Sequence, residues 1–377
     1  MDGLIFWSVV AARVLIPLAI PRFPLPAMLV ALVIDGVDQT IFQTFTSLDL
    51  SGYQSYDKAL DVYYLSIAYT ATLRNWTHLV AFNTSRFLFY YRMVGVVLFE
   101  LSQIRAVLLI FPNTFEYFFD FYEAVRIRWN PLRMTAAIVI GAAAFIWIFI
   151  KLPQEWWIHV AQLDMTDFIK ESIFGVPAET SWADAIATNP LPLLIVVAVL
   201  VVAAVGAWWL ITRRLPPADH PPTFDADKHT QPVDPDLVAS TRRGLAERLF
   251  DRELIEKIAL TALLAVIFGR MLPGVDAAPV GVAVGVAILI VANTAVSEWL
   301  VRRGGDVGTA IRQFSVLLVI NVGVVLVGQL LVSFLHGPTL EHSLVFVLLF
   351  SLVLTLYDRY RPIYLARFAA GPLKQLA

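Results

Sequence analysis

Long apolar blocks alternate with shorter polar segments along most of the chain. A transmembrane helix needs about 20 predominantly apolar residues, and most of the blocks approach that length. The pattern therefore predicts an all-α, polytopic integral membrane protein with about 11 transmembrane helices. The predicted spans cover residues 4–20, 26–46, 59–74, 87–101, 106–125, 135–150, 191–211, 255–272, 277–300, 313–335 and 341–357.

A stretch rich in Pro and Asp divides these spans into two groups. Residues 1–212 form the predicted N-terminal membrane module, which includes an outer interfacial segment over residues 151–188. Residues 213–242 lack apolar periodicity, so we expect a cytoplasmic linker there. Residues 243–377 form the predicted C-terminal four-helix membrane module with a basic tail. Its spans carry few charges, which suits a scaffold, docking or oligomerisation role.

The apolar block at residues 26–46 carries a polar stripe. Its members stand at helical positions i, i+3, i+4 and i+8: Asp35, Asp38, Gln39 and Gln43. A carboxylate at mid-membrane costs roughly 2.5 to 3.5 kcal/mol on insertion scales. The two acids must therefore face a protein interior, a partner or water, and the stripe marks a candidate site for transport or coupling.

Charges on other predicted helices fall at a similar depth. Counting about 1.5 Å per residue, we place Arg13, Asp35, Arg92, Glu116 and Asp120 in the inner half of the membrane. Two interpretations stay open. In the first, Arg13 pairs with Asp35 and Arg92 with Glu116, and these ion pairs hold the bundle together. In the second, the same groups line a water-filled cavity that opens to the cytoplasm, with Asp38 deeper inside.

The predicted helix over residues 106–125 has a second acidic stripe. Its polar members are Asn113, Glu116, Asp120 and Glu123. Acids on one face repel each other unless they are protonated, paired or shared by a cation, as in a proton or cation path. Pro112 and Asn113 also interrupt the helix and free carbonyl groups that can coordinate an ion. For Glu123 we expect a simpler role at the membrane surface, beside Arg126.

Two acids are candidates for the outer half of the same path: Asp61 and Glu100. Asp61 shares a helix face with Asp57 and Tyr64, and we assign Asp57 to a loop. Alternatively, Asp61 forms an interfacial salt bridge of small value with Arg105. The spacing of these residues does not decide between the two.

Composition supports a membrane protein. Hydrophobic residues make up 58% of the 377 residues and charged residues only 15%, and the mean hydropathy is +0.71. Lys and Arg gather in alternate connectors, which places the N-terminus outside and the C-terminus inside. Abundant Arg, Ala and Val are typical of a GC-rich bacterial genome, so the membrane we expect is a bacterial plasma membrane. The chain has no cysteine, which excludes disulfides and thiolate chemistry.

The sequence contains no nucleotide-binding, zincin or nucleophile-elbow motif, and its histidines lack metal-ligand spacing. We therefore predict no metal site and no nucleic-acid partner, and the sequence identifies no cofactor. The leading hypothesis is a transporter or channel-like protein for a small solute or ion, coupled to protons or cations through the intramembrane carboxylates. The expected partners are the lipid bilayer, a solute, proton or cation, and a second copy or another membrane protein at the C-terminal module.

Two alternatives remain open. One is a membrane-embedded enzyme that acts on a lipid or lipid-linked substrate at the outer face. Its candidate acid or base groups are Asp49, Asp57, His159 and Asp164. The other is a non-catalytic membrane assembly subunit, which the C-terminal module would suit.

Overall fold

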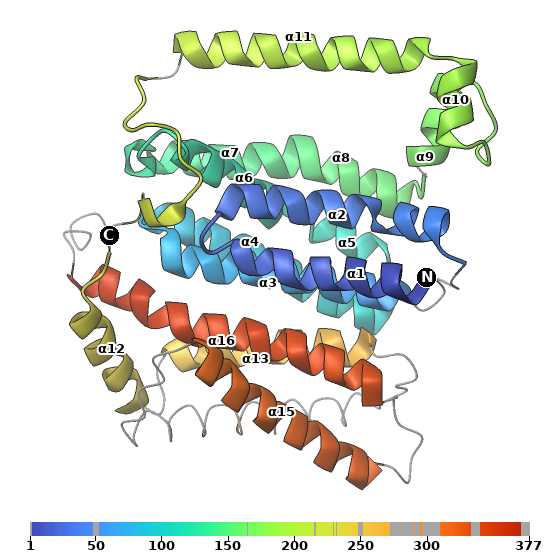
Figure 1. Ribbon diagram of the computed structural model, residues 1–377. Coiled ribbons are helices and arrows are strands. Elements are labelled where there is room, and N and C mark those ends of the chain that lie inside the picture. Colours follow the sequence, from blue (N-terminus) through green and yellow to red (C-terminus); the bar gives the residue numbers. More distant parts are fainter. Residues whose placement is uncertain are drawn as a thin grey trace.

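The computed structural model describes residues 2–47, 53–163, 165–214, 216–228, 230, 232–247, 252–271, 291, 295, 310–332 and 340–370. Within these ranges the protein consists of helices and their connectors, with no strand, and most of the helices run side by side (Figure 1). The predicted all-α class is confirmed. The predicted span at residues 277–300 lies almost entirely outside the described residues.

The first two helices form a hairpin. It consists of α1 (Asp2–Leu15), a 3₁₀ turn η1 (Ile16–Ala19) and α2 (Pro24–Phe45). Prolines stand in the first turns of η1 and α2, where a missing N–H costs no helical hydrogen bond. The backbone N–H of Phe23 donates to the carbonyl of Ala19 at 2.8 Å and closes the turn. The hairpin packs α1 against α2, and both helices contact α3.

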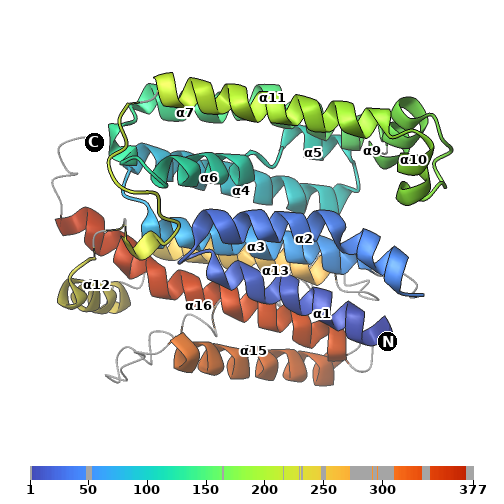
Figure 2. The same ribbon diagram turned by 45° about the horizontal axis from the view of Figure 1, so that its top comes forward.

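The third helix, α3 (Tyr53–Asn75), is central, and nearly every side chain from Ala59 to Trp76 is buried. Its neighbours are α1, α2, α4 (Leu79–Ser102), α13 (Arg252–Met271) and α16 (Leu340–Ala370). Figure 2 shows α16 beside α3, with α15 (Ala310–Val332) on the far side of α16. A helix surrounded by protein needs no apolar surface for lipid, so α3 can carry polar groups.

The chain after α4 does not continue as one span. α5 (Ala106–Ile110) and α6 (Thr114–Arg126) are separated by an irregular stretch that contains Pro112. A β-carbon at Gly95 of α4 would lie 2.1 Å from the β-carbon of Phe111 in that stretch. Glycine at position 95 therefore allows α4 to approach the break closely.

The following helix is longer than the sequence predicts. A continuous helix from Ala136 to Val160 is built from α7 (Ala136–Phe145), η3 (Ile146–Lys151), α8 (Leu152–Glu155) and η4 (Trp156–Val160). The helix therefore continues beyond residue 150, where the sequence predicts the span to end, and it includes residues 151–160 of the expected outer segment. The reason is that Lys151 and Glu155 are buried against protein, while Ile148 and Phe149 face outward. Charges on the inner face do not end a helix whose outer face stays apolar.

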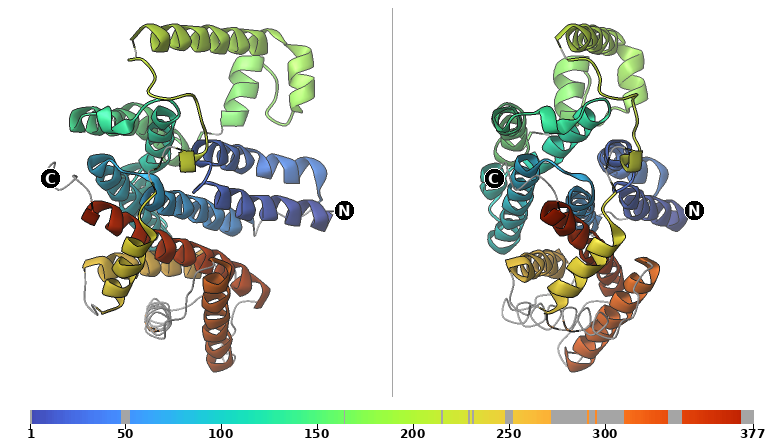
Figure 3. Two further views of the ribbon diagram at one scale, coloured as in Figure 1. Left: turned by 60° about the vertical axis from the view of Figure 1, so that its left-hand side comes forward. Right: turned by 90° about the vertical axis from the view of Figure 1, so that its left-hand side faces the viewer.

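Beyond this helix the chain forms short elements and then a long apolar helix. These are α9 (Met165–Phe168), η5 (Ile169–Phe174), α10 (Trp182–Thr188) and α11 (Leu191–Arg214). In Figures 1 and 3, α11 lies at the edge of the molecule. Apolar side chains such as Leu194, Val199 and Val202 are exposed along it. This surface is consistent with contact to lipid.

Three helices in the described part of the chain are long and apolar enough to cross a membrane. They are Asp2–Ala19, Pro24–Phe45 and Ala136–Val160, and the bent pair Trp182–Thr188 with Leu191–Val202 makes a fourth if it is one span. The predicted number of about 11 spans is therefore not confirmed. α3, α4 and the α5–α6 pair are not among the three, because they carry more polar side chains or are broken.

The Pro- and Asp-rich segment contains a short 3₁₀ helix η6 (Ala226–Lys228) and leads into α12 (Pro235–Glu247). Figure 3 shows this segment running along the bundle. Asp219 pairs with Arg133 at 2.7 Å, and the N–H of Ala226 donates to the carbonyl of Arg22 at 2.8 Å. The segment therefore packs against helix ends, whereas the lack of apolar periodicity suggested a detached linker. Its acids can pair with arginines that the connectors present.

The C-terminal helices pack directly on the N-terminal ones. Glu256 of α13 accepts a hydrogen bond from Tyr69 of α3 and lies 3.7 Å from Arg86 of α4. Within the C-terminal group, Lys257 of α13 pairs with Asp358 of α16 at 2.8 Å. The division into two modules stays a prediction, and polar contacts join the two groups of helices.

Candidate functional site

A buried arginine contacts four carboxylates inside the bundle. Arg13 of α1 has only 3% of its side chain exposed. Its two terminal nitrogens contact one carboxylate oxygen from each of four residues, Asp35 and Asp38 on α2 and Asp57 and Asp61 on α3. The Nη2 atom lies 2.6 Å from Asp61 Oδ1. These five residues are called the Arg13 cluster below.

Helical spacing on two helices produces this convergence. Asp35 and Asp38 are three residues apart on α2, and Asp57 and Asp61 are four apart on α3, so each pair shares one helix face. Arg13 stands near the end of α1, beside the hairpin turn. Its long side chain carries the guanidinium group to the carboxylates of α2 and α3.

The charges within the Arg13 cluster do not balance. One guanidinium faces four carboxylates, an excess of three negative charges if all four are ionised. Such an excess of negative charge around a buried arginine is reduced by protons or by a bound cation. One oxygen from each of Asp35, Asp57 and Asp61 lies within 4.8 Å of the other two, a spacing at which carboxylates can share a hard cation.

The cluster is enclosed on one side and open on the other. The side chain of Asp38 is 3% exposed, whereas those of Asp57 and Asp61 are 40% and 38% exposed. An ion or water molecule can therefore reach the cluster beside α3. Asp38 is the carboxylate farthest from that access.

A second polar group begins one helical turn along α3. Tyr64 stands three residues after Asp61, and its hydroxyl donates to Glu116 Oε2 of α6 at 2.9 Å. The amide of Asn113 also donates to this carboxylate oxygen. Tyr64 therefore links the face of α3 that holds the Arg13 cluster to a buried acid on the broken α5–α6 segment.

The polar group continues onto the helix over residues 136–160. The backbone N–H of Asn113 donates to Glu155 Oε1 at 3.1 Å. Glu155 also lies 3.8 Å from Arg92 Nη1 and 3.0 Å from His159 Nε2. We call the set of Tyr64, Glu116, Asn113, Glu155, Arg92 and His159 the Glu116 group. The group contains two acids, Glu116 and Glu155, and two basic side chains, Arg92 and His159. It therefore needs fewer added positive charges than the Arg13 cluster.

Two acids of the α6 stripe have different environments. Glu123 accepts from Arg126 at 2.8 Å and from the Trp76 indole at 2.6 Å, which gives it a structural role inside the bundle. The expected pairing of Glu123 with Arg126 is present, and its expected position at the membrane surface stays a prediction. Asp120 has one buried carboxylate oxygen, Oδ1, without a hydrogen-bond partner among the described residues. Of the two, Asp120 is the one left able to take up a proton.

Several predicted residues lie elsewhere or have other partners. Arg92 pairs with Glu155 and not with Glu116. Glu100 is buried near the end of α4, 3.4 Å from Lys58, and is not a member of the Arg13 cluster. Gln39 follows Asp38, but its side chain is exposed.

The depth estimate from the sequence also needs correction. Asp61 was placed toward the outer side and Arg13 in the inner half, yet the two are in contact. The estimate counted backbone rise and ignored the reach of the arginine side chain. Asp57, which the sequence assigned to a loop, stands on α3 in the same cluster.

Two further buried charges, Lys151 and Glu155, lie outside the set of site residues predicted from the sequence; they are 4% and 5% exposed. Together with His159 they stand at positions i, i+4 and i+8, so they share one face of the extended helix. That spacing was visible in the sequence. A charge inside an apolar run does not end the helix when the face that carries it packs against protein.

The residues considered for an enzyme do not gather at one point. Asp57 contacts Arg13 and His159 contacts Glu155, so they belong to different polar groups. Asp49 and Asp164 lie outside the described residues. Comparison of the chain with protein-family models, with curated proteins and with solved structures found no match.

Proposed function

We propose that this chain is a multi-pass protein of a bacterial plasma membrane that moves protons or small cations, alone or coupled to a solute. The Arg13 cluster carries the proposal, because one guanidinium cannot neutralise four carboxylates. A purely structural ion pair needs one acid for one base. The surplus acids provide sites that take up and release positive charge.

The proposed path runs from the Arg13 cluster to the Glu116 group. A proton or cation enters beside the exposed carboxylates Asp57 and Asp61. It is exchanged among the four acids around Arg13, and Tyr64 provides the hydroxyl that connects α3 to Glu116. Hydroxyl and carboxylate groups at hydrogen-bond distance can relay protons inside a membrane protein. Asp120, one turn beyond Glu116 on α6, is the next acceptor along the same face.

Arg13 has two roles in this proposal. Its fixed positive charge keeps part of the cluster ionised and holds α1, α2 and α3 together. It also prevents a cation from binding too tightly, because the cation and the guanidinium compete for the same oxygens. Exchange needs binding that is favourable but reversible.

The test is ion flux in proteoliposomes. The wild-type chain is reconstituted with a pH-sensitive dye inside the vesicles, and a potassium diffusion potential, negative inside, drives protons inward. We expect faster acidification than in protein-free vesicles. Asp38→Asn and Glu116→Gln preserve size and hydrogen bonding but cannot titrate, so each variant should reduce the rate at least about tenfold.

The matched control is Glu179→Gln, which makes the same chemical change at an exposed acid outside both polar groups. This variant should conduct like the wild type. If wild-type vesicles acidify no faster than empty ones under the same potential, the proposal is wrong for protons. Repeating the experiment with radioactive sodium or rubidium tests the cation version in the same vesicles.

A further inference from the structure

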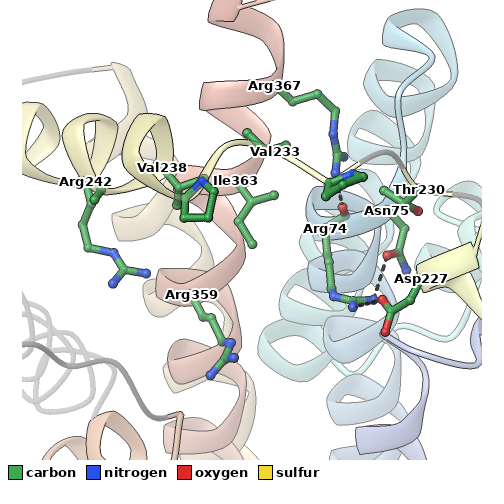
Figure 4. A pocket seen from close by; sticks show the side chains of 13 residues that line it. Arg74, Asn75, Asp227, Thr230, Val233, Val238, Arg242, Arg359, Ile363 and Arg367 are labelled. Carbon is green, nitrogen blue, oxygen red and sulfur yellow. Dashed lines mark hydrogen bonds and ion pairs between the residues drawn. The ribbon is translucent and has the colours of Figure 1, made fainter.

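A basic pocket lies away from the Arg13 cluster, at the opposite end of α3. Its volume is about 610 Å³. It lies between the last turn of α3, α12, α16 and the segment that leads into α12, and Figure 4 shows it from close by. The positive-inside rule places this end of the bundle at the cytoplasmic side.

The walls of the pocket carry mostly positive charge. Its charged residues are Arg74 from α3, Asp227 from η6, Arg242 from α12, and Arg359 and Arg367 from α16. Four guanidinium groups thus face one carboxylate among the described lining residues, an excess of three positive charges. Arginines brought together from three helices repel one another unless an anion is present.

Two of the arginines are fixed by the protein. Arg74 pairs with Asp227 and donates to the carbonyl of Pro21. Arg367 donates to the carbonyls of Trp76 and Arg74 at 3.2 and 2.7 Å. The pocket thus has a rigid basic wall on this side.

One nitrogen of Arg367, the buried Nε, is not hydrogen-bonded to any residue that the structure describes. Burial, and then the nearby Arg126 and Arg74, lowers the pKa of Arg367 to about 10. The group remains charged at neutral pH, and an anion beside it would offset this unfavourable environment.

The other two arginines are available to a ligand. Neither Arg242 nor Arg359 forms a salt bridge with any residue that the structure describes. Both side chains are half-buried. In Figure 4 they extend from α12 and α16, while Arg74 and Asp227 lie on the other side of the view.

We propose that this pocket binds a phosphate-bearing anion through Arg242 and Arg359, with Arg367 and Arg74 as the fixed wall behind them. Guanidinium groups bind phosphate oxygens in a bidentate manner, which favours phosphate over monovalent anions. The volume lies within the range of about 300 to 1,000 Å³ that small-molecule sites occupy. It exceeds what a single phosphate fills, so the ligand carries more than one phosphate or further polar groups.

The same chemistry has two sources, a soluble phosphorylated compound or the headgroup of an anionic lipid. Two of the lining arginines, Arg359 and Arg367, follow the predicted span at residues 341–357. They therefore lie near the membrane surface, at the level where lipid phosphates are found. The experiment therefore has two arms. In the first, the full-length protein in detergent is titrated with sodium pyrophosphate at low ionic strength, and the binding heat is measured. In the second, native mass spectrometry measures retention of phosphatidic acid relative to phosphatidylcholine.

The key variant is Arg242→Gln combined with Arg359→Gln. We expect it to weaken binding of the effective probe at least about tenfold. The matched control is Arg243→Gln, because Arg243 is the exposed neighbour of Arg242 on α12 and does not line the pocket. The control should bind like the wild type, and circular dichroism checks that all variants are folded.

A second double variant, Arg242→Lys with Arg359→Lys, keeps both charges and removes the bidentate geometry. It should bind the effective probe at least about threefold more weakly than the control. If the glutamine variant does not fold, this lysine variant alone tests the proposal. Pyrophosphate binding alone indicates a soluble ligand, and retention of phosphatidic acid alone indicates a lipid headgroup. The proposal is overturned if the wild type binds neither probe, or if both double variants bind as tightly as the control.

Discussion

Replacing Arg13 by leucine is the most direct perturbation of the Arg13 cluster. In a simple ion pair, either single change leaves one unpaired charge, and the double change recovers most of the loss. Here Arg13→Leu leaves four carboxylates facing one another, while Asp35→Asn leaves Arg13 with three acidic partners. The two substitutions should therefore have very different effects on stability.

The magnitudes follow from this count. Removing one partner from a buried ion pair costs about 3 to 5 kcal/mol, so we expect at least about that loss of unfolding free energy for Arg13→Leu. For Asp35→Asn we expect a change of less than about 1 kcal/mol, because a lost contact to Arg13 is offset by reduced repulsion among the acids. The double variant should stay close to Arg13→Leu, because three carboxylates would still face one another without the Arg13 charge.

The assay is reversible unfolding in mixed micelles, in which sodium dodecyl sulfate is titrated into the protein in dodecylmaltoside. The tryptophan fluorescence and the far-ultraviolet circular dichroism together report the transition, since Trp76 is fully buried beside α6. Arg105→Leu is the matched control, because Arg105 is an exposed arginine in the same bundle. An Arg13→Leu variant within about 1 kcal/mol of the control would refute the reasoning, and so would full recovery in the double variant.

Three further changes test other parts of the structure. Tyr64→Phe removes the hydroxyl that donates to Glu116; it should cost about 1 kcal/mol of stability and reduce proton flux severalfold in the vesicle assay, and unchanged flux would exclude the relay. Gly95→Ala places a methyl group against Phe111. We expect the unfolding free energy in the micelle titration to fall by about 1 to 3 kcal/mol; an unchanged value would show that the residues around Phe111 can move to make room for the methyl group. Glu123→Gln removes a buried partner of an arginine and should destabilise by about 3 to 5 kcal/mol; a well-folded variant that conducts poorly would instead place Glu123 in the path.

Much of the architecture could be predicted from the sequence. Helix periodicity and apolar length place α1, α2 and α7 as candidate spans, since both properties are local. The stripe on α2 predicted that Asp35 and Asp38 face a protein interior, a partner or water, because a carboxylate exposed to lipid is costly; both contact Arg13, and Asp38 is buried. The Pro112 break was likewise visible, because proline cannot donate the helical hydrogen bond.

Only the tertiary structure decided which charges meet. Spacing along one helix gives the face that a residue occupies, and it does not give the rotation or offset of neighbouring helices. For that reason the sequence suggested Arg13 with Asp35 alone, whereas helix packing brings Asp38, Asp57 and Asp61 to the same guanidinium. The basic pocket has the same origin, since its arginines lie between residues 74 and 367 of the sequence and come together only through the packing of α3, α12 and α16.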